Sequence, residues 1–469
     1  MFLIIQVNMK YNQKLLFYFF AGLYLLLTFA CRNHIFFGDM VQFASRHPHF
    51  FLENNFNTIY LPNNLDSGHP PLFGIYIAFT WLLFGKSLIV SHFAMVPFLL
   101  VIAYQVPKLL SRWLSGTNLF FASILILIEP TLLAQSLLVS PDVVLMALFI
   151  TAINLYLDKK YYLLAFILIP LGLISLRGMM VLFAAFLSIV LSNWKSLNFI
   201  NELKQTILYF TPAVAIAFTW LYLHYQHSGW IGFHSDSPWA SSFQRVSSFQ
   251  MLKNAFLFAW RLVDFGRIAL LILAIVFFWK GQNIYKSNRS LTIAILVFIV
   301  VFAMNTLFAD GLVGHRYYLP IYFLMLLFVL KNSSIVFPNH QFLTFLIIFS
   351  SFLIGSILVY PKKVAMGWDA TPAHIPYYCL RANAIDFLNE KNIPLAKVAS
   401  GFPNLDSREI LELNGDTSRF ISYADSNSQY ILYSNIFNFP DELIDQIECI
   451  KPIYYQKSGG VFIGIYPLK

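Results

Sequence analysis

Residues 290–308 read SLTIAILVFIVVFAMNTLF, an apolar run without a single charged side chain. A helix needs about 20 such residues to cross the roughly 30 Å hydrocarbon core of a bilayer. Comparable runs recur along the first 360 of the 469 residues. They predict an α-helical polytopic membrane protein.

The composition supports this interpretation. Only 11% of the residues are charged and 58% are hydrophobic, whereas soluble chains carry about 25% charged residues. The net charge of +9 comes from Lys and Arg placed between apolar runs rather than in a basic stripe, so it does not indicate nucleic-acid binding. The cysteines at 31, 379 and 449 lack metal-ligand spacing, and whether Cys379 and Cys449 pair stays open.

We expect eleven spans, with the first read as an uncleaved helix and the N-terminus in the cytoplasm. All the basic loops then fall on the cytoplasmic face, as the positive-inside rule requires. The spans lie near residues 14–31, 87–107, 117–138, 143–158, 161–177, 178–193, 206–224, 262–280, 290–308, 316–331 and 341–360.

The apolar run Pro71–Phe84 needs a separate argument. Its 14 residues make a helix of only about 21 Å at 1.5 Å per residue. If it crossed, Lys108 and Arg112 would move outside and every later loop would invert. We therefore expect an interfacial helix in the first outer loop, which places Asp39, His69 and Asp142 on the outer face.

Beyond residue 360 the composition becomes that of a soluble protein, so we divide the chain into a membrane domain, 1–360, and an extracytoplasmic domain, 361–469. The second domain is expected to be a small α/β fold. Its expected elements are helices over 381–391 and 441–450, strands over 397–402 and 430–434, and a hairpin over 453–466.

The first 359 residues contain only ten acidic side chains, and because each is costly in a membrane domain, function is sought among them. They are Asp39, Glu53, Asp66, Glu129, Asp142, Asp158, Glu202, Asp236, Asp264 and Asp310. Two of them belong to short motifs. Asp39 stands in FFGDM (36–40) and Asp142 in SPDVVL (140–145), and GHPPL (68–72) lies between these two motifs. Taken singly, each has an ordinary explanation: a solvated helix end, a helix cap, and a structural His before a helix-starting proline.

The order of these motifs resembles the GT-C superfamily of glycosyltransferases that use polyprenyl-phosphate sugars. Within it, residues 32–190 look most like protein O-mannosyltransferases and lipid A aminoarabinose transferases. The likeness lies in an acid after the first span, HPPL through LFG (69–85), a second acid near Leu138–Leu145, and Arg177-Gly178. Relatives usually carry Asp-Glu at the first position, where this chain has Asp39-Met40.

The resemblance implies a site on the outer face of the cytoplasmic membrane. It implies Asp39 as the base and Asp142 as a second catalytic acid, with Arg177, His315 and Arg316 binding the donor phosphate and His69 in the substrate pocket. The implied reaction transfers one sugar, with inversion, to a hydroxyl on protein, glycan or lipid. The lipid-linked sugar is the donor substrate; no cofactor is named, and a divalent metal requirement stays open.

We expect other polar residues of the membrane domain to have mainly structural roles. Glu129 is expected to face the bundle as a buried, protonated carboxyl, without an assigned role. Arg261, Asp264 and Arg267 have helical spacing and predict an ion-pair cluster. The aromatic loop 225–252 is interpreted either as a cover for the lipid-sugar pocket or as an interfacial segment.

Two other functional classes stay open at this stage. A transporter or lipid flippase would also be polytopic, but such proteins place polar groups near the midplane and show internal repeats, neither of which is evident here. A catalytically inactive scaffold is kept open by Met40.

Overall fold

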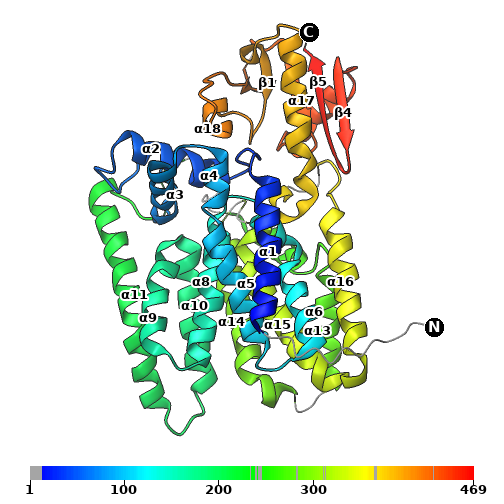
Figure 1. The fold of residues 1–469 in the computed structure, drawn as a ribbon. Coiled ribbons are helices and arrows are strands. Elements are labelled where there is room, and N and C mark those ends of the chain that lie inside the picture. The colour runs from blue at the N-terminus through cyan, green and yellow to red at the C-terminus, as the bar shows by residue number, and fades with distance from the viewer. Residues whose placement is uncertain are drawn as a thin grey trace, which may run out of the picture.

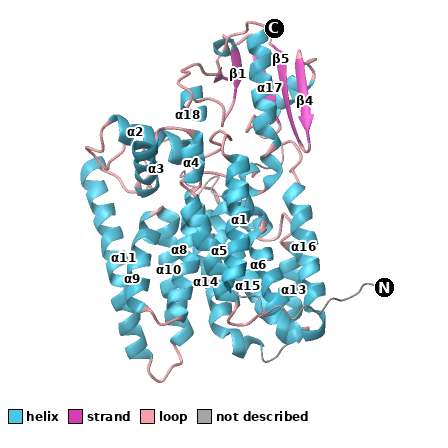
Figure 2. Ribbon diagram, viewed as in Figure 1, coloured by secondary structure: helices cyan, strands magenta, loops and turns pink. Residues whose placement is uncertain are grey.

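The computed structural model describes residues 13–232, 234–237, 240, 246–280, 284–309, 311, 313–363, 367–425 and 427–468. It consists of a long helical bundle with a small domain containing a β-sheet at one end (Figures 1 and 2). Asp310 and residues 233, 238, 239 and 241–245 of the aromatic loop lie outside the described residues.

The bundle contains most of the helices. Their bounds are α1 (Gln13–Cys31), α4 (Leu88–Phe93), α5 (Val96–Leu110), α6 (Gly116–Leu127), α7 (Pro130–Ser136), α8 (Pro141–Leu157), α9 (Tyr161–Leu173), α10 (Leu176–Asn193), α11 (Phe199–Ser228), α12 (Ser248–Arg261), α13 (Ile268–Lys280), α14 (Ile284–Leu307), η3 (His315–Tyr318), α15 (Leu319–Val336), η4 (Pro338–His340) and α16 (Gln341–Ile357).

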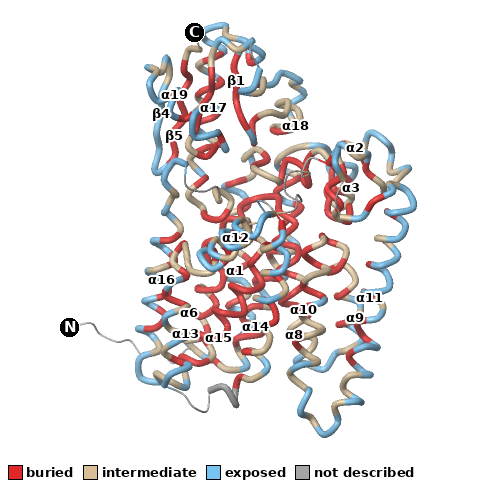
Figure 3. Tube along the Cα trace, turned by 180° about the vertical axis from the view of Figure 1, so that it is seen from behind, coloured by how far each residue is buried: buried red, intermediate tan, exposed pale blue. Residues whose placement is uncertain are grey.

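The expectation of a polytopic helical protein is confirmed. Within the described residues, seven helical segments are long and apolar enough to span a membrane, or eight if the pair α6–α7, bent by 68°, counts as one. The remaining three expected spans correspond to the shorter apolar helices α8, α9 and α13. Large apolar side chains such as Leu26, Phe166 and Trp279 are exposed, as expected where lipid is the solvent. Figure 3 shows exposed and intermediate residues along the outer helices of the bundle.

One span is shorter than predicted. The segment expected at 262–280 is helical only from Ile268, because α12 ends at Arg261 and a turn separates the two helices. Phe265 and Gly266 in this turn have positive φ, and the Gly266 position lies so close to the Ser351 carbonyl that a Cβ would clash with it. The turn also carries Asp264, whose partners are described below.

The segment between α1 and α4, which was predicted to be the first outer loop and keeps that name below, contains η1, a π-helical turn (Gln42–Arg46), α2 (His47–Glu53) and α3 (Leu72–Phe84). His49, before α3, and Lys86, after it, both contact the carboxylate of Glu409. The segments before and after α3 therefore meet at one residue of the C-terminal domain. This arrangement matches the expectation that Pro71–Phe84 is not a span.

The basic residues between spans gather at the other end. Lys108 and Arg112, after α5, pair with Asp158 at 2.7 and 2.6 Å. Asp158 follows the last residue of α8, whereas Asp142 lies in the first turn of that helix. The predicted catalytic acid and these cations thus lie at opposite ends of one helix.

The C-terminal segment forms the small α/β domain predicted from the sequence. Its elements are η5 (Trp368–Ala370), η6 (Pro372–His374), α17 (Pro376–Glu390), η7 (Leu395–Lys397), β1 (Val398–Ser400), α18 (Arg408–Glu412), β2 (Ile421–Ser422), β3 (Tyr430–Ser434), α19 (Asp441–Glu448), β4 (Tyr454–Ser458) and β5 (Val461–Pro467). The strand order is β2-β1-β3-β5-β4, parallel among β2, β1 and β3 and antiparallel from β3 through β5 to β4. The short elements α18 and β2 were not predicted, and none of the three cysteines is disulfide-bonded.

The helix η3–α15 forms the centre of the bundle. In its most apolar stretch 78% of the residues are buried inside the protein, compared with 28–44% in the other long spans. A helix that is apolar on all sides is expected in such a central position. Its first turn carries His315 and Arg316, so the core of the bundle fixes where these two side chains lie.

Candidate active site

Asp142 is held at the start of α8. Ser140 is the N-cap, and its hydroxyl accepts a hydrogen bond from the backbone N–H of Asp142 at 3.2 Å. The cap is therefore supplied by Ser140, which leaves the Asp142 carboxylate free for other contacts. Its side chain is only 3% exposed and faces two guanidinium groups.

The first of these groups belongs to Arg177, in the first turn of α10. Ser175 caps the helix by accepting from the N–H of Gly178. Gly178 packs so closely on the Leu171 carbonyl that a Cβ would lie 1.9 Å from its oxygen, so the helix start is fixed against α9. Arg177 reaches Asp142 at 2.9 Å and lies over the ring of Tyr317 at 4.4 Å.

Arg316 joins three carboxylates. Its guanidinium contacts Asp39, lies 2.6 Å from Asp369 and approaches Asp142 at 3.5 Å. The side chain is 4% exposed, so these charges meet largely out of water. Three carboxylates and two guanidiniums (Arg177 and Arg316) leave the cluster with one excess negative charge.

Asp39 is the most accessible of the predicted charged residues in this cluster. It follows α1, beside Gly38 at φ +58°, and its side chain is 17% exposed. Neighbouring Phe37 is buried and stacks on His374 of the C-terminal segment, with ring centroids 5.0 Å apart. The apolar half of the FFGDM motif thus anchors the loop, and the acid projects from the anchored loop.

The sequence argument missed Asp369, which lies in η5, the first turn of the C-terminal domain. Two hydrogen bonds hold this turn on α7: Gln135 donates to the Asp369 carbonyl at 2.8 Å, and Thr131 to the Ala370 carbonyl at 3.0 Å. The only available signal was its position just after the last apolar run. Counting acids only in the first 359 residues excluded it.

His69 lies beside the cluster as a neutral group. Its Nδ1 accepts a hydrogen bond from the backbone N–H of Leu176 at 3.0 Å, next to Arg177. The residue keeps part of its surface exposed, but burial of the ring, and next the charge of Arg177, lower the pKa of His69 to about 3. At neutral pH it therefore acts through hydrogen bonds and does not add positive charge.

These side chains come from elements far apart in the chain. The residues brought together are Asp39 after α1, Asp142 in α8, Arg177 in α10, Arg316 in η3 and Asp369 in η5. We call these five residues the carboxylate–arginine cluster. Within the described residues, no group of three or more His, Cys, Asp or Glu side chains is arranged to hold a metal ion.

Comparisons with known proteins bear on the fold. No protein-family model matches the sequence, and no functionally curated protein matches it. Among solved structures, ArnT from Cupriavidus metallidurans bound to undecaprenyl phosphate is similar, with a TM-score of 0.53 and 12% identity over 96% of this chain and 97% of ArnT. The chain has the GT-C fold. The arabinofuranosyltransferase AftD from Mycobacteria matches 97% of this chain but only 40% of its own length, with a TM-score of 0.46 and 14% identity.

Within this GT-C fold, His315 does not join the carboxylate–arginine cluster. Its Nε2 lies 2.6 Å from the Asp264 carboxylate, and the ring is fully buried. Asp264 also pairs with Arg261 and Arg267, at 3.4 and 3.3 Å. The expected ion-pair cluster of these residues is therefore present, although they lie around a turn rather than on one continuous helix.

Glu129 belongs to this second network. It is buried, as expected, but it receives a hydrogen bond from Arg267 at 2.7 Å and caps α7 by accepting from the N–H of Leu132. Its neighbour in the core is thus a guanidinium that is itself fully buried. The network fixes the turn between α12 and α13 against α7.

Met40, the departure from the Asp-Glu pattern, is 1% exposed and packs in the apolar core of this GT-C bundle. A carboxylate at this position would be buried among apolar side chains. The second carboxylate near Asp39 is instead Asp369, which shares Arg316 with it.

The described part of the aromatic loop 225–252 packs on the first outer loop. Trp230 donates to Asn63 at 3.1 Å, and Ser237 donates to the Asp66 carbonyl at 2.9 Å. Asp66 in turn pairs with buried His224 at 2.8 Å and accepts from the N–H of Gly68. The loop thereby supports the segment that carries His69.

Proposed function

We propose that this protein is a membrane glycosyltransferase that moves one monosaccharide from a polyprenyl-phosphate donor to a hydroxyl acceptor, with inversion. The observation that carries the proposal is the carboxylate–arginine cluster, which joins five segments at one end of a bundle with the GT-C fold. ArnT, which has that fold, was solved bound to undecaprenyl phosphate. A site with both bases and guanidiniums suits a reaction in which a hydroxyl loses a proton and a phosphate departs.

Arg177 and Arg316 are the proposed ligands of the donor phosphate. Arginine binds phosphate oxygens through paired, charge-assisted hydrogen bonds. The buried Nε–H of Arg177 has no hydrogen-bond partner among the described residues, so one donor is available to an incoming oxygen. His315 is not included, because its ring is engaged by Asp264.

Asp39 is the proposed base. In the free protein its carboxylate is paired with Arg316. The donor phosphate competes for the same guanidinium, and when Arg316 turns to the phosphate, Asp39 is released. Donor binding then creates the free carboxylate that the acceptor hydroxyl requires.

The reaction is a single displacement. The acceptor oxygen attacks the anomeric carbon as its proton passes to Asp39, and the bond from that carbon to the phosphate oxygen breaks. The electron pair leaves with polyprenyl phosphate, whose negative charge is stabilised by the two arginines. Attack opposite the leaving group inverts the anomeric carbon.

Asp142 is proposed to position the two arginines. It is the more buried of the two predicted acids and lies within 3.5 Å of both guanidiniums. Positioning of this kind matters because displaced charges lose much of their effect on the transition state. The neutral His69, fixed by the Leu176 N–H, is proposed to line the sugar pocket.

We place the site on the outer face of the cytoplasmic membrane, with the N-terminus inside and the C-terminal domain outside. The supporting observation is that the basic loop residues Lys108 and Arg112 lie at the opposite end of the bundle from Asp142. The acceptor hydroxyl belongs to a protein, a glycan or a lipid.

The test uses the purified full chain in lipid nanodiscs with a panel of radiolabelled polyprenyl-phosphate sugars and extracts of envelope proteins, glycans and lipids. We expect labelled sugar on one acceptor class and stoichiometric release of polyprenyl phosphate. Movement of intact donor across liposome membranes without any sugar transfer would instead show that the protein is a lipid flippase. Donor binding with neither transfer nor transport would establish the scaffold.

A further inference from the structure

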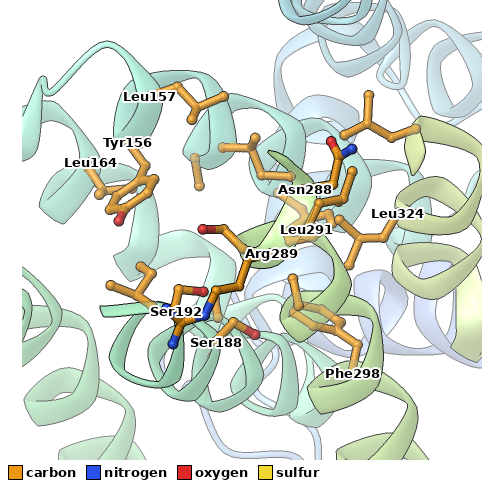
Figure 4. Close-up of a pocket in the computed structure, with 18 of the residues that line it drawn as sticks. Tyr156, Leu157, Leu164, Ser188, Ser192, Asn288, Arg289, Leu291, Phe298 and Leu324 are labelled. Carbon is orange, nitrogen blue, oxygen red and sulfur yellow. The ribbon is translucent and has the colours of Figure 1, made fainter. Parts of the chain in front are cut away.

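One cavity of the described structure has no residue of the carboxylate–arginine cluster in its lining. Its volume is about 390 Å³, within the range of about 300–1,000 Å³ typical of ligand pockets. Figure 4 shows it between α8, α9, α10, α14 and α15, with Arg289 crossing it toward Ser188 and Ser192. Nothing in the proposed transfer reaction uses this space.

Helix directions place the cavity at the end of the bundle that carries the basic loops. Tyr156 and Leu157 line it from the last turn of α8, whose first turn carries Asp142. Ser192 lies at the end of α10, whose first turn carries Arg177. In both helices the proposed active site lies at one end, and the cavity extends from the other end through the middle of the bundle as far as Leu171 of α9.

The interior of the cavity is apolar. Its walls are formed by leucines and phenylalanines from five helices. We call the part of the cavity lined by the following residues the apolar shaft: Phe149, Leu164, Leu168, Leu171, Phe298 and Leu324. Such a lining favours a hydrocarbon chain over a polar metabolite.

The polar groups of the cavity include two cations. Arg289 and Lys331 both contribute to its lining, and no acidic residue does. Within the described residues, neither cation forms an ion pair, in contrast to Lys108 and Arg112, which share Asp158. Lys331 lies over the ring of Trp113 at 4.9 Å, and Trp113 also lines the cavity.

A kink in α14 positions one of these cations. Asn288 has non-helical angles, φ −121° and ψ 19°, inside the helix, and its side-chain amide donates to Asn332 of α15 at 2.7 Å. Arg289 follows the kink directly. The kink, fixed by a buried hydrogen bond, thus sets where Arg289 leaves the helix.

From these observations we infer that the cavity binds an anionic phospholipid of the adjacent leaflet, with one acyl chain in the apolar shaft and the phosphate on Arg289 and Lys331. Charge complementarity supports this occupant, because two cations without acidic partners close an apolar shaft at the level of interfacial aromatics. Free phosphate would not need the shaft, and a polyprenyl tail entering from the other end would not need the cations.

The test is native mass spectrometry of the purified full chain, titrated in detergent with phosphatidylglycerol or phosphatidylcholine. We expect one phosphatidylglycerol to bind more tightly than phosphatidylcholine. The double variant Arg289→Ala/Lys331→Ala should weaken it roughly thirty-fold, since each cation contributes about five-fold. Lys195→Ala, an exposed cation in the α10–α11 loop, is the matched control and should change nothing.

A second variant addresses the shaft without altering charge. Ala185→Phe fills the cavity from α10 and should also remove the bound phosphatidylglycerol. Unchanged phosphatidylglycerol binding in folded double and Ala185→Phe variants would overturn the inference. So would a bound polyprenyl phosphate that is lost in Ala185→Phe but retained in the double variant, because the cavity would then hold the donor's tail.

Discussion

Arg267 shows how the membrane domain accommodates a fully buried charged side chain. Fully buried, it is compensated by Glu129 and Asp264 and lies over the ring of Tyr322 at 3.8 Å. Removing one member of a buried pair leaves an uncompensated charge, which costs about 3–5 kcal/mol. Among the described residues, most acidic side chains of the bundle accordingly pair with a basic side chain.

We predict that Glu129→Gln lowers the thermal stability of the purified protein strongly, because Arg267 loses its main partner. The double variant Glu129→Gln/Arg267→Met should recover much of the loss, since Gln still caps α7 and Met fills the guanidinium's space. Thermal unfolding in detergent measures both. Additive losses in the double variant would show that the pair is not coupled.

The neutrality of His69 predicts a pH dependence of stability. Its folded pKa is about 3, below the unfolded value near 6.5, so between these values the unfolded state binds more protons. Stability should therefore fall as the pH drops from 6.5 toward 3, by up to about 1.4 kcal/mol per pH unit from this group.

His69→Gln is the variant that isolates this effect. Gln does not titrate and retains an acceptor for the Leu176 N–H. The melting temperature of the variant should decline less than that of the parent between pH 7 and pH 5. Identical slopes would contradict the lowered pKa, because they would mean that His69 titrates alike in the folded and unfolded protein.

At the scale of elements, hydropathy predicted the helices well because lipid imposes a simple requirement of length and apolarity. Hydropathy did not predict helix breaks that depend on contacts between particular side chains. The break between α12 and α13 depends on Asp264 meeting His315 and on Gly266 fitting against Ser351, which a hydropathy pattern does not record.

The candidate site could be predicted in part, because most of its residues belong to short sequence motifs. Asp39, Asp142, Arg177 and Arg316 belong to motifs at helix ends, and the structure brings all four together. Asp369 comes from a turn whose position is set by hydrogen bonds to α7. His315 adjoins Arg316 in sequence, but the turn directs it to the other network.

Topology gives a prediction for the first outer loop. In a cysteine-free background, an impermeant thiol reagent should label Glu53→Cys in intact cells, because exposed Glu53 ends α2 on the proposed outer face. Lys160→Cys, equally exposed before α9, should react only after the membrane is opened. Labelling of position 160 in intact cells would invert the proposed orientation.

At the scale of the whole molecule, the C-terminal domain is docked on the membrane domain rather than tethered by a free linker. Arg46 pairs with Asp406 at 2.5 Å, and the N–H of Phe36 donates to the Leu411 carbonyl at 3.1 Å. Phe36 belongs to the FFGDM motif that carries Asp39, and Asp369 lies in η5 at the start of the C-terminal domain. Docking and the carboxylate–arginine cluster are therefore structurally connected.

A charge swap tests this docking. Arg46→Asp should loosen the domain and speed proteolysis between α16 and η5, because two like charges then face each other. Adding Asp406→Arg should restore resistance, since the pair is re-formed with reversed sign. Single exposed pairs contribute only about 0–1 kcal/mol, so the repulsion, rather than the lost attraction, gives the signal. Equal resistance in all three proteins would exclude a role for this contact.

The central claim is that Asp39 is the base of a sugar transfer from polyprenyl phosphate, and Asp39→Asn tests it most directly. Asn is close in size but cannot take the proton, and it no longer competes for Arg316. The measurement is single-turnover transfer with separate determination of donor binding, alongside Arg177→Ala. We predict that Asp39→Asn binds donor at least as well as the parent but transfers sugar about 10²–10⁴-fold more slowly, whereas Arg177→Ala loses both affinity and rate. Transfer by Asp39→Asn at the parental rate would contradict the account.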